Sequence, residues 1–96
     1  MRFVFHPDAE EEFNKAIDYY EELQNGLSAR FANEVYLTIQ RILSFPKAWS
    51  ILEDDIRRCL CNKFPFGIIY YQQDQTIVIL AVMELHQDPN YWKSRV

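Results

Sequence analysis

The sequence predicts a single small α+β domain over residues 1–96, in the order β-α-α-β-β-β, with a helical hairpin packed on a largely antiparallel sheet. β-branched and aromatic runs at 56–60, 64–71 and 77–83 follow one another with short polar breaks, which is typical of a three-strand meander. Two segments before them carry apolar residues at helical spacing. Only a few residues join these segments, which indicates an antiparallel pair of helices whose apolar stripes cover the sheet.

A short strand and a helix open the chain. Residues 2–6 alternate as a strand, and Pro7 suits the first turn of a helix because its missing N–H is not needed there. Acidic residues crowd that turn, where the helix dipole favours negative charge, so a solvated helix start is preferred over a metal site. The apolar stripe of this helix consists of Ala9, Phe13, Ala16, Ile17 and Tyr20.

The second helix is bounded by glycine and proline. Asn25-Gly26 ends the first helix, and Ser28 is the expected N-cap of the second. Phe45-Pro46 ends the second helix, since the residue before proline disfavours the helical conformation. We expect its stripe to face the sheet together with that of the first helix, through Phe13, Ile17, Tyr20, Phe31, Val35, Ile39 and Ile42.

The rest of the chain is expected to be a loop, the meander and a short terminal turn. Residues 47–55 read as a loop that holds Trp49, and Pro65 stands at the start of the middle strand, where a missing donor is tolerated. Asp88-Pro89 indicates a turn, and residues 90–96 are expected to form one helical turn.

Composition limits the function classes. The net charge is −4 and the pI about 5.0, which argues against broad, charge-driven binding of nucleic acid but leaves room for a local basic patch. Cys59 and Cys61 are the only cysteines and form no disulfide framework, which fits a reducing compartment. The chain has neither a signal-peptide pattern nor an apolar run that could span a bilayer. We therefore expect a cytoplasmic protein without membrane partners.

No cofactor or metal site is expected. The two glycines do not form a phosphate-binding loop, and His6 and His86 are isolated from each other and from the cysteines. The spacing gives no support for a Cys–His nucleophile pair. We interpret Cys59 and Cys61 instead as two small thiols packed on the sheet.

Arg57 and Arg58 are the strongest candidates for a functional role. Neighbouring strand residues point to opposite faces, so one arginine should follow the helix-covered face and the other should reach the open face. Two interpretations stay open. Each arginine pairs with a carboxylate of the hairpin or of residues 53–55, or one of them binds a phosphate or a developing negative charge.

Glu84 and His86 are the second candidates. They stand two apart near a strand end, so their side chains share a face in an extended conformation. A carboxylate and an imidazole are able general acid–base groups. The alternative is an exposed, polar strand end without a catalytic role.

The order of several motifs resembles the RelE/ParE family of toxins from bacterial toxin–antitoxin pairs. These motifs are FHPDAEEEF, the paired tyrosines 19–20, Pro46 with Trp49, Arg57-Arg58, and Phe64-Pro65-Phe66 with Tyr70. The resemblance implies a β-α-α-β-β-β fold and a cognate antitoxin that wraps the toxin with an extended, partly helical segment. The motifs are closer to the ParE-like branch, which is associated with poisoning DNA gyrase, than to the RelE-like branch of ribosome-dependent endoribonucleases.

One departure from the family pattern bears on mechanism. Many relatives carry a His and an Arg after the last strand, at the positions that are Glu84 and Gln87 here. The leading hypothesis is therefore a ParE-like toxin that binds gyrase, with Arg57, Arg58, Tyr91 and Trp92 contacting the target. The alternatives are a ribosome-dependent mRNA endoribonuclease, which uses an arginine with Glu84 and His86, and an inactive scaffold that only binds antitoxin.

Overall fold

The computed structural model describes residues 1–96 as two helices and a five-stranded sheet. The helices are α1 (Pro7–Leu23) and α2 (Leu27–Ser44). The strands are β1 (Arg2–Phe5), β2 (Ser50–Glu53), β3 (Ile56–Leu60), β4 (Phe66–Gln73) and β5 (Thr76–Glu84). A 3-10 turn, η1 (Tyr91–Arg95), follows the last strand. The α+β class and the antiparallel meander of the sequence prediction are confirmed.

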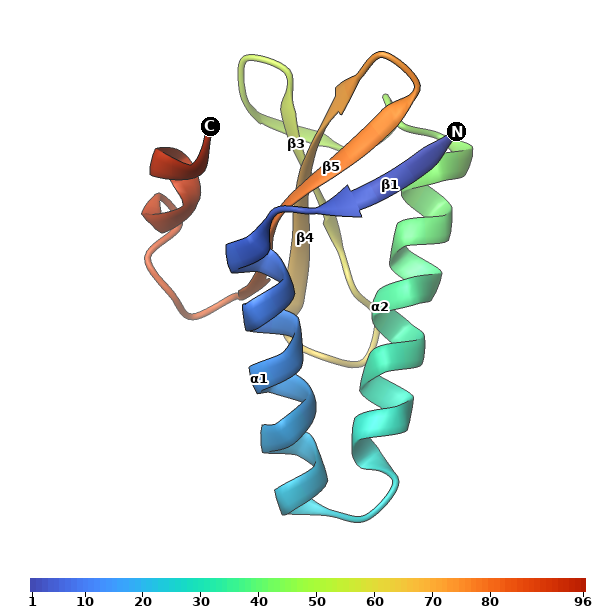
Figure 1. Ribbon diagram of the computed structural model, residues 1–96, viewed down its shortest axis with the longest axis vertical. Coiled ribbons are helices and arrows are strands. Elements are labelled where there is room, and N and C mark those ends of the chain that lie inside the picture. The colour runs from blue at the N-terminus through green and yellow to red at the C-terminus, as the bar shows by residue number, and fades with distance from the viewer.

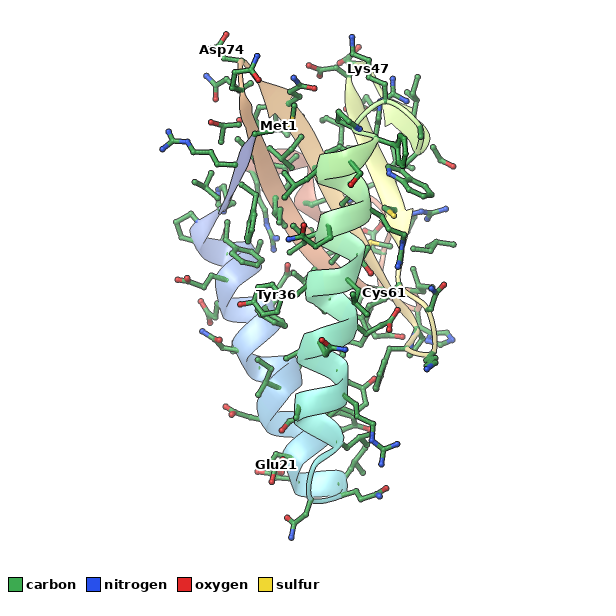
Figure 2. All side chains as sticks on the ribbon, turned by 90° about the vertical axis from the view of Figure 1, so that its right-hand side faces the viewer. Met1, Glu21, Tyr36, Lys47, Cys61 and Asp74 are labelled. Carbon is green, nitrogen blue, oxygen red and sulfur yellow. The ribbon has the colours of Figure 1, made fainter.

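The strand order is β1-β5-β4-β3-β2, with β1 parallel to β5 and every other pair antiparallel. Figure 1 shows the sheet between α2 on one side and the C-terminal turn on the other. The two helices lie side by side and extend beyond the sheet, so that Glu21 and Lys47 mark opposite ends of the molecule in Figure 2. No helix has both the length and the apolar character needed to cross a membrane.

Strand β2 corrects the expectation of a plain loop over residues 47–55. Its four residues are all exposed and show no alternation, so the sequence carries no burial signal for it. Its pairing with β3, where Ile51 lies opposite Arg57, creates the strand, and Asp54 takes the positive φ of 51° in the tight turn between them. β2 is consequently the outer edge of the sheet.

The helix boundaries agree with the sequence except at one cap. Pro7 is the first residue of α1, and His6 Nδ1 accepts a hydrogen bond of 3.0 Å from the Asp8 amide. Ser28 is not an N-cap, because Gly26 adopts φ 85° and α2 already begins at Leu27. The Ser28 hydroxyl instead donates to Glu21 and joins the ends of the two helices.

The main core lies between the helices and one face of the sheet. Its aromatic centre is Phe31, whose ring lies 4.9 Å from those of Tyr20 and Phe66, measured between centroids. The predicted stripe is confirmed: Ile17 and Tyr20 pack against this core, and the following stripe residues are fully within it: Phe13, Phe31, Val35, Ile39 and Ile42.

A second, smaller core lies on the opposite face. The register between β4 and β5 shifts after Ile69, which pairs with Ala81 while Tyr70 pairs with Ile79. This bulge places Leu80 and Ala81 in the same cluster on the open face. Trp92 of η1 closes that cluster and is only 1% exposed.

Candidate functional site

Arg57 lies on the helix-covered face of the sheet, opposite Tyr70 of β4. Its Nη1 donates a 2.8 Å hydrogen bond to the carbonyl of Trp49. It lines a polar cavity of about 310 Å3 at the sheet end, together with Lys47, Asp55, Tyr70, Gln72, Asp74 and Pro46. Burial raises the pKa of Tyr70 to about 12, and its hydroxyl donates to the Pro46 carbonyl at 2.6 Å. Arg57 therefore holds the loop that precedes β2.

Arg58 lies on the open face, opposite Ile69. Its stem crosses Gly67, where an added Cβ would come within 3.1 Å of the Arg58 Cδ atom. Arg58 forms no ion pair, and its Nε is buried without an acceptor. It lines a cavity of about 140 Å3 with Leu52, Ile69, Met83, Pro89, Asn90, Trp92 and Lys93. The structure thus decides which of the two arginines reaches the open face.

Glu84 and His86 meet at the end of β5. His86 Nδ1 and Glu84 Oε1 lie 2.5 Å apart, and the His86 amide donates to Glu84 Oε2 at 3.1 Å. The imidazole is 83% exposed. Both residues border a cleft of about 500 Å3 along α1, formed with Ala16, Tyr19, Tyr20, Pro65 and Phe66. Arg57, Arg58 and the Glu84–His86 pair consequently line three different cavities.

The C-terminal aromatic residues have different surroundings. Trp92 is buried against Leu80 and Met83, so it attaches η1 to the sheet. Tyr91 is half-buried, and the guanidinium carbon of Arg95 lies 4.9 Å from its ring centroid. The Tyr91 hydroxyl is buried without a hydrogen-bond partner, although the residue as a whole is partly exposed.

Comparison with known proteins identifies the family. The family model described as ParE toxin of type II toxin-antitoxin system, parDE, matches residues 3–89. The chain belongs to the ParE toxin family. This match confirms the resemblance to the RelE/ParE family that the sequence motifs indicated, and the matching model is that of ParE. No curated protein matches the chain.

A solved structure supports the fold of this ParE-family chain. The chromosomal ParDE toxin–antitoxin system from P. aeruginosa contains a chain that superposes with a TM-score of 0.77 at 14% sequence identity. The match covers 90% of this chain and 97% of the other. The shared fold at such low identity is consistent with a core built from apolar spacing.

Two residues of the ParE-family chain were not singled out by the sequence, Glu12 of α1 and Arg95 of η1. Arg95 donates from Nη1 to Glu12 Oε1 at 2.9 Å and from Nη2 to Oε2 at 3.0 Å. Arg95 Nη1 also reaches the Leu80 carbonyl at 2.9 Å, and Glu12 accepts from the Val82 amide at 3.1 Å. The hydrogen bond to Glu12 raises the pKa of Arg95.

This ion pair covers a free strand edge. β1 pairs with β5 only as far as Ile79, so the next backbone groups of β5 have no neighbouring strand. Glu12 and Arg95 satisfy two of those groups and attach the C-terminal turn to α1. The two residues are 83 positions apart, and neither belongs to a local motif.

The cysteines of the ParE-family chain are not poised as nucleophiles. Burial raises the pKa of the Cys61 thiol to about 11 and raises that of Cys59 as well. Both thiols are therefore protonated at neutral pH, whereas the thiolate is the reactive form. No three His, Cys, Asp or Glu side chains are grouped so that they could hold a metal ion.

Proposed function

We propose that this ParE-family chain is a toxin that inhibits DNA gyrase through protein–protein contacts, and that it does not cleave RNA. The absence of RNA cleavage is inferred from the distance between the candidate catalytic residues, which lie at three separate places. Arg57 lies under the helices, Arg58 lies on the open face, and Glu84 with His86 borders the cleft along α1.

Phosphodiester cleavage needs these groups at one place. A cation that stabilises the transition-state charge acts within hydrogen-bond distance of the phosphate, and the acid and base must reach the same reacting atoms. Gln87 stands where relatives hold an arginine, and its side-chain carbonyl accepts from the Glu84 amide at 3.2 Å. The end of β5 thus combines a carboxylate with a local turn and contains no arginine, which favours a binding role over catalysis.

The antitoxin is proposed to occupy the cleft along α1. Tyr19, at 59% exposure, and the neighbouring Leu23, at 58%, leave a large apolar area in water. Exposed apolar area of this kind is typical of partner sites. An antitoxin helix or strand that covers it would also reach Glu84 and His86 at the rim.

Two parallel assays with purified chain test the mechanism. We expect inhibition of gyrase supercoiling, and no ribosome-dependent message cleavage by primer extension. Since the unmodified chain is expected not to cleave message, Arg57→Ala and His86→Ala should show no cleavage either. Clear cleavage that either substitution abolishes, with gyrase unaffected, would establish the endoribonuclease alternative. If the chain still captures its antitoxin but neither inhibits gyrase nor cleaves message, the inactive scaffold would be established.

Co-expression tests the antitoxin part separately. The chain should be recovered from a pull-down with the product of the neighbouring open reading frame. Tyr19→Ser should weaken that complex strongly, whereas Tyr36→Ser, which alters a 45%-exposed tyrosine outside the cleft, should not. Recovery of the chain alone would count against the toxin–antitoxin function.

A further inference from the structure

We infer that the cavity beside Arg58 binds a single acidic side chain, an aspartate or glutamate presented by a partner protein. The cavity lies on the open face between β2, the β3–β4 pair and the segment before η1. It belongs neither to the cleft along α1 nor to the polar cavity around Arg57. Its lining carries donors and one uncompensated positive charge.

Arg58 is held in place without a counter-charge. Its Cγ and Cδ atoms lie over Gly67, because the missing side chain leaves room there: an added Cβ would lie 3.2 Å and 3.1 Å from them. No carboxylate of the chain pairs with its guanidinium, and its Nε has no acceptor. A half-buried guanidinium fixed in this way presents a planar set of donors that matches a carboxylate.

The other polar groups of the cavity offer donors as well, and the Asn90 amide can also accept. Trp92 is 1% exposed, and its indole Nε1 is buried without an acceptor. Lys93 Nζ pairs with Glu53 at 3.0 Å, so its charge is already balanced. Asn90 adds a side-chain amide. Arg58 is therefore the charge that an incoming group must balance, and one carboxylate balances it.

The size and the walls of the cavity favour a side chain over a nucleotide. Its volume of about 140 Å3 lies below the roughly 300–1,000 Å3 that small-molecule and cofactor sites usually offer. Leu52, Ile69 and Met83 form an apolar wall, which suits the methylene stem of an acidic residue and not the oxygen-covered surface of a phosphate. The net charge of −4 disfavours a polyanion further.

This inference rests on the proposed function only for the role of the partner, which would be the protein target. The binding chemistry stands independently, so a chain that leaves gyrase active can still bind an acidic group at Arg58. The experiment therefore uses the intact, full-length chain and defined small probes. Blocked glutamate (N-acetyl-glutamate-N-methylamide) is the probe, and blocked glutamine is its uncharged isostere.

Titration followed by 1H–15N NMR gives a direct readout. The chain has two tryptophans, so the Trp92 indole reports on the cavity, and the Trp49 indole, which packs against the other core, serves as an internal control. We expect a saturable shift of the Trp92 indole and the Arg58 Nε–H signals with blocked glutamate, at millimolar Kd, and none with blocked glutamine. Equal shifts with both probes, or no saturable shift, would overturn the inference.

Variants and a second anion complete the test. Arg58→Gln should abolish the shift, whereas Arg57→Gln, which changes the neighbouring arginine on the opposite face, should keep it. Gly67→Ala should weaken binding at least tenfold, because the added Cβ displaces the Arg58 stem. If the Arg58→Gln variant does not fold, Gly67→Ala is used in its place. Inorganic phosphate is expected to bind more weakly than blocked glutamate. Binding of phosphate without binding of glutamate would overturn the assignment to an acidic side chain.

Discussion

The helix-covered face of the sheet buries a cluster of 13 residues under two long helices, whereas the open face buries six and is closed by a 3-10 turn of five residues. Both faces also bury polar side chains. Under the helices, the Glu34 carboxylate accepts from the Asn62 amide and the Thr38 hydroxyl donates to the Glu34 carbonyl. Buried donors without acceptors occur on both sides of the sheet: Trp49 Nε1 beside the helix-covered core, and Arg58 Nε and Trp92 Nε1 on the open face.

The two faces differ in size and in what their unsatisfied donors adjoin, and this difference separates stability from recognition. Buried donors without partners cost free energy, so a face selected for stability alone would satisfy or replace them. Of these residues, only Arg58 and Trp92 line a cavity, and a short segment tied by the Arg95–Glu12 and Lys93–Glu53 ion pairs covers the rest of the open face. We therefore expect substitutions under the helices to change folding, and substitutions around Arg58 to change binding.

The largest effect should come from the centre of the helix-covered face. Phe31→Ala removes a ring with no exposed area and should lower the free energy of unfolding by about 3–5 kcal/mol, in the range for large buried apolar residues. Urea denaturation of the purified chain measures it. Phe45→Ala, at a 66%-exposed phenylalanine after the same helix, is the matched control and should shift the midpoint little. Similar midpoints for the two variants would show that the core is misassigned.

An intermediate effect should follow from breaking the ion pair that attaches the C-terminal turn. Glu12→Gln removes the charge that holds Arg95 and weakens the acceptor of the Val82 amide, which should cost about 1–3 kcal/mol. Hydrogen exchange at Val82 should accelerate more than exchange in α2. Glu11→Gln, at the exposed pair with Lys15, is the control, and an equal effect there would argue for a general charge effect.

A third effect is a pH dependence of stability that arises on the helix-covered face. The pKa of Cys61 is raised from 9.0 to about 11 by burial, so between these values the unfolded thiol loses its proton while the folded one keeps it. The free energy of unfolding should therefore fall as pH rises, by at most about 2 kcal/mol. Urea midpoints across this range should fall less steeply in Cys61→Ala. Tyr70 acts in the same direction at higher pH, from 10.0 to about 12.

The smallest effect on folding should come from Arg58. It has no hydrogen bond or ion pair to lose, so Arg58→Gln should change the free energy of unfolding by only about 0.5 kcal/mol. Arg57→Gln should cost more, because it removes the bond to the Trp49 carbonyl. Thermal denaturation of the two variants decides between them. A larger loss for Arg58→Gln would mean that its guanidinium supports the fold.

Much of the fold followed from local periodicity. The stripes through Phe31, Val35 and Ile39 and the three runs of the meander repeat at helical or strand spacing, so each predicts its own buried face. Strand β2 was missed because all four of its residues are exposed and only pairing with β3 makes it a strand. The cap at Ser28 was wrong because the backbone freedom of Gly26 starts α2 one residue earlier.

The sequence by itself determined the ParE-type architecture, the strand position of both arginines and their opposite directions, because alternation along a strand is a local property. Only the tertiary structure decided that Arg57 faces the helices and Arg58 the open side, since that depends on which face the hairpin covers. It also decided the burial of Trp92 and the pairing of Glu12 with Arg95 across 83 positions. Contacts between distant segments form through the packing of the whole chain, and no local pattern encodes them.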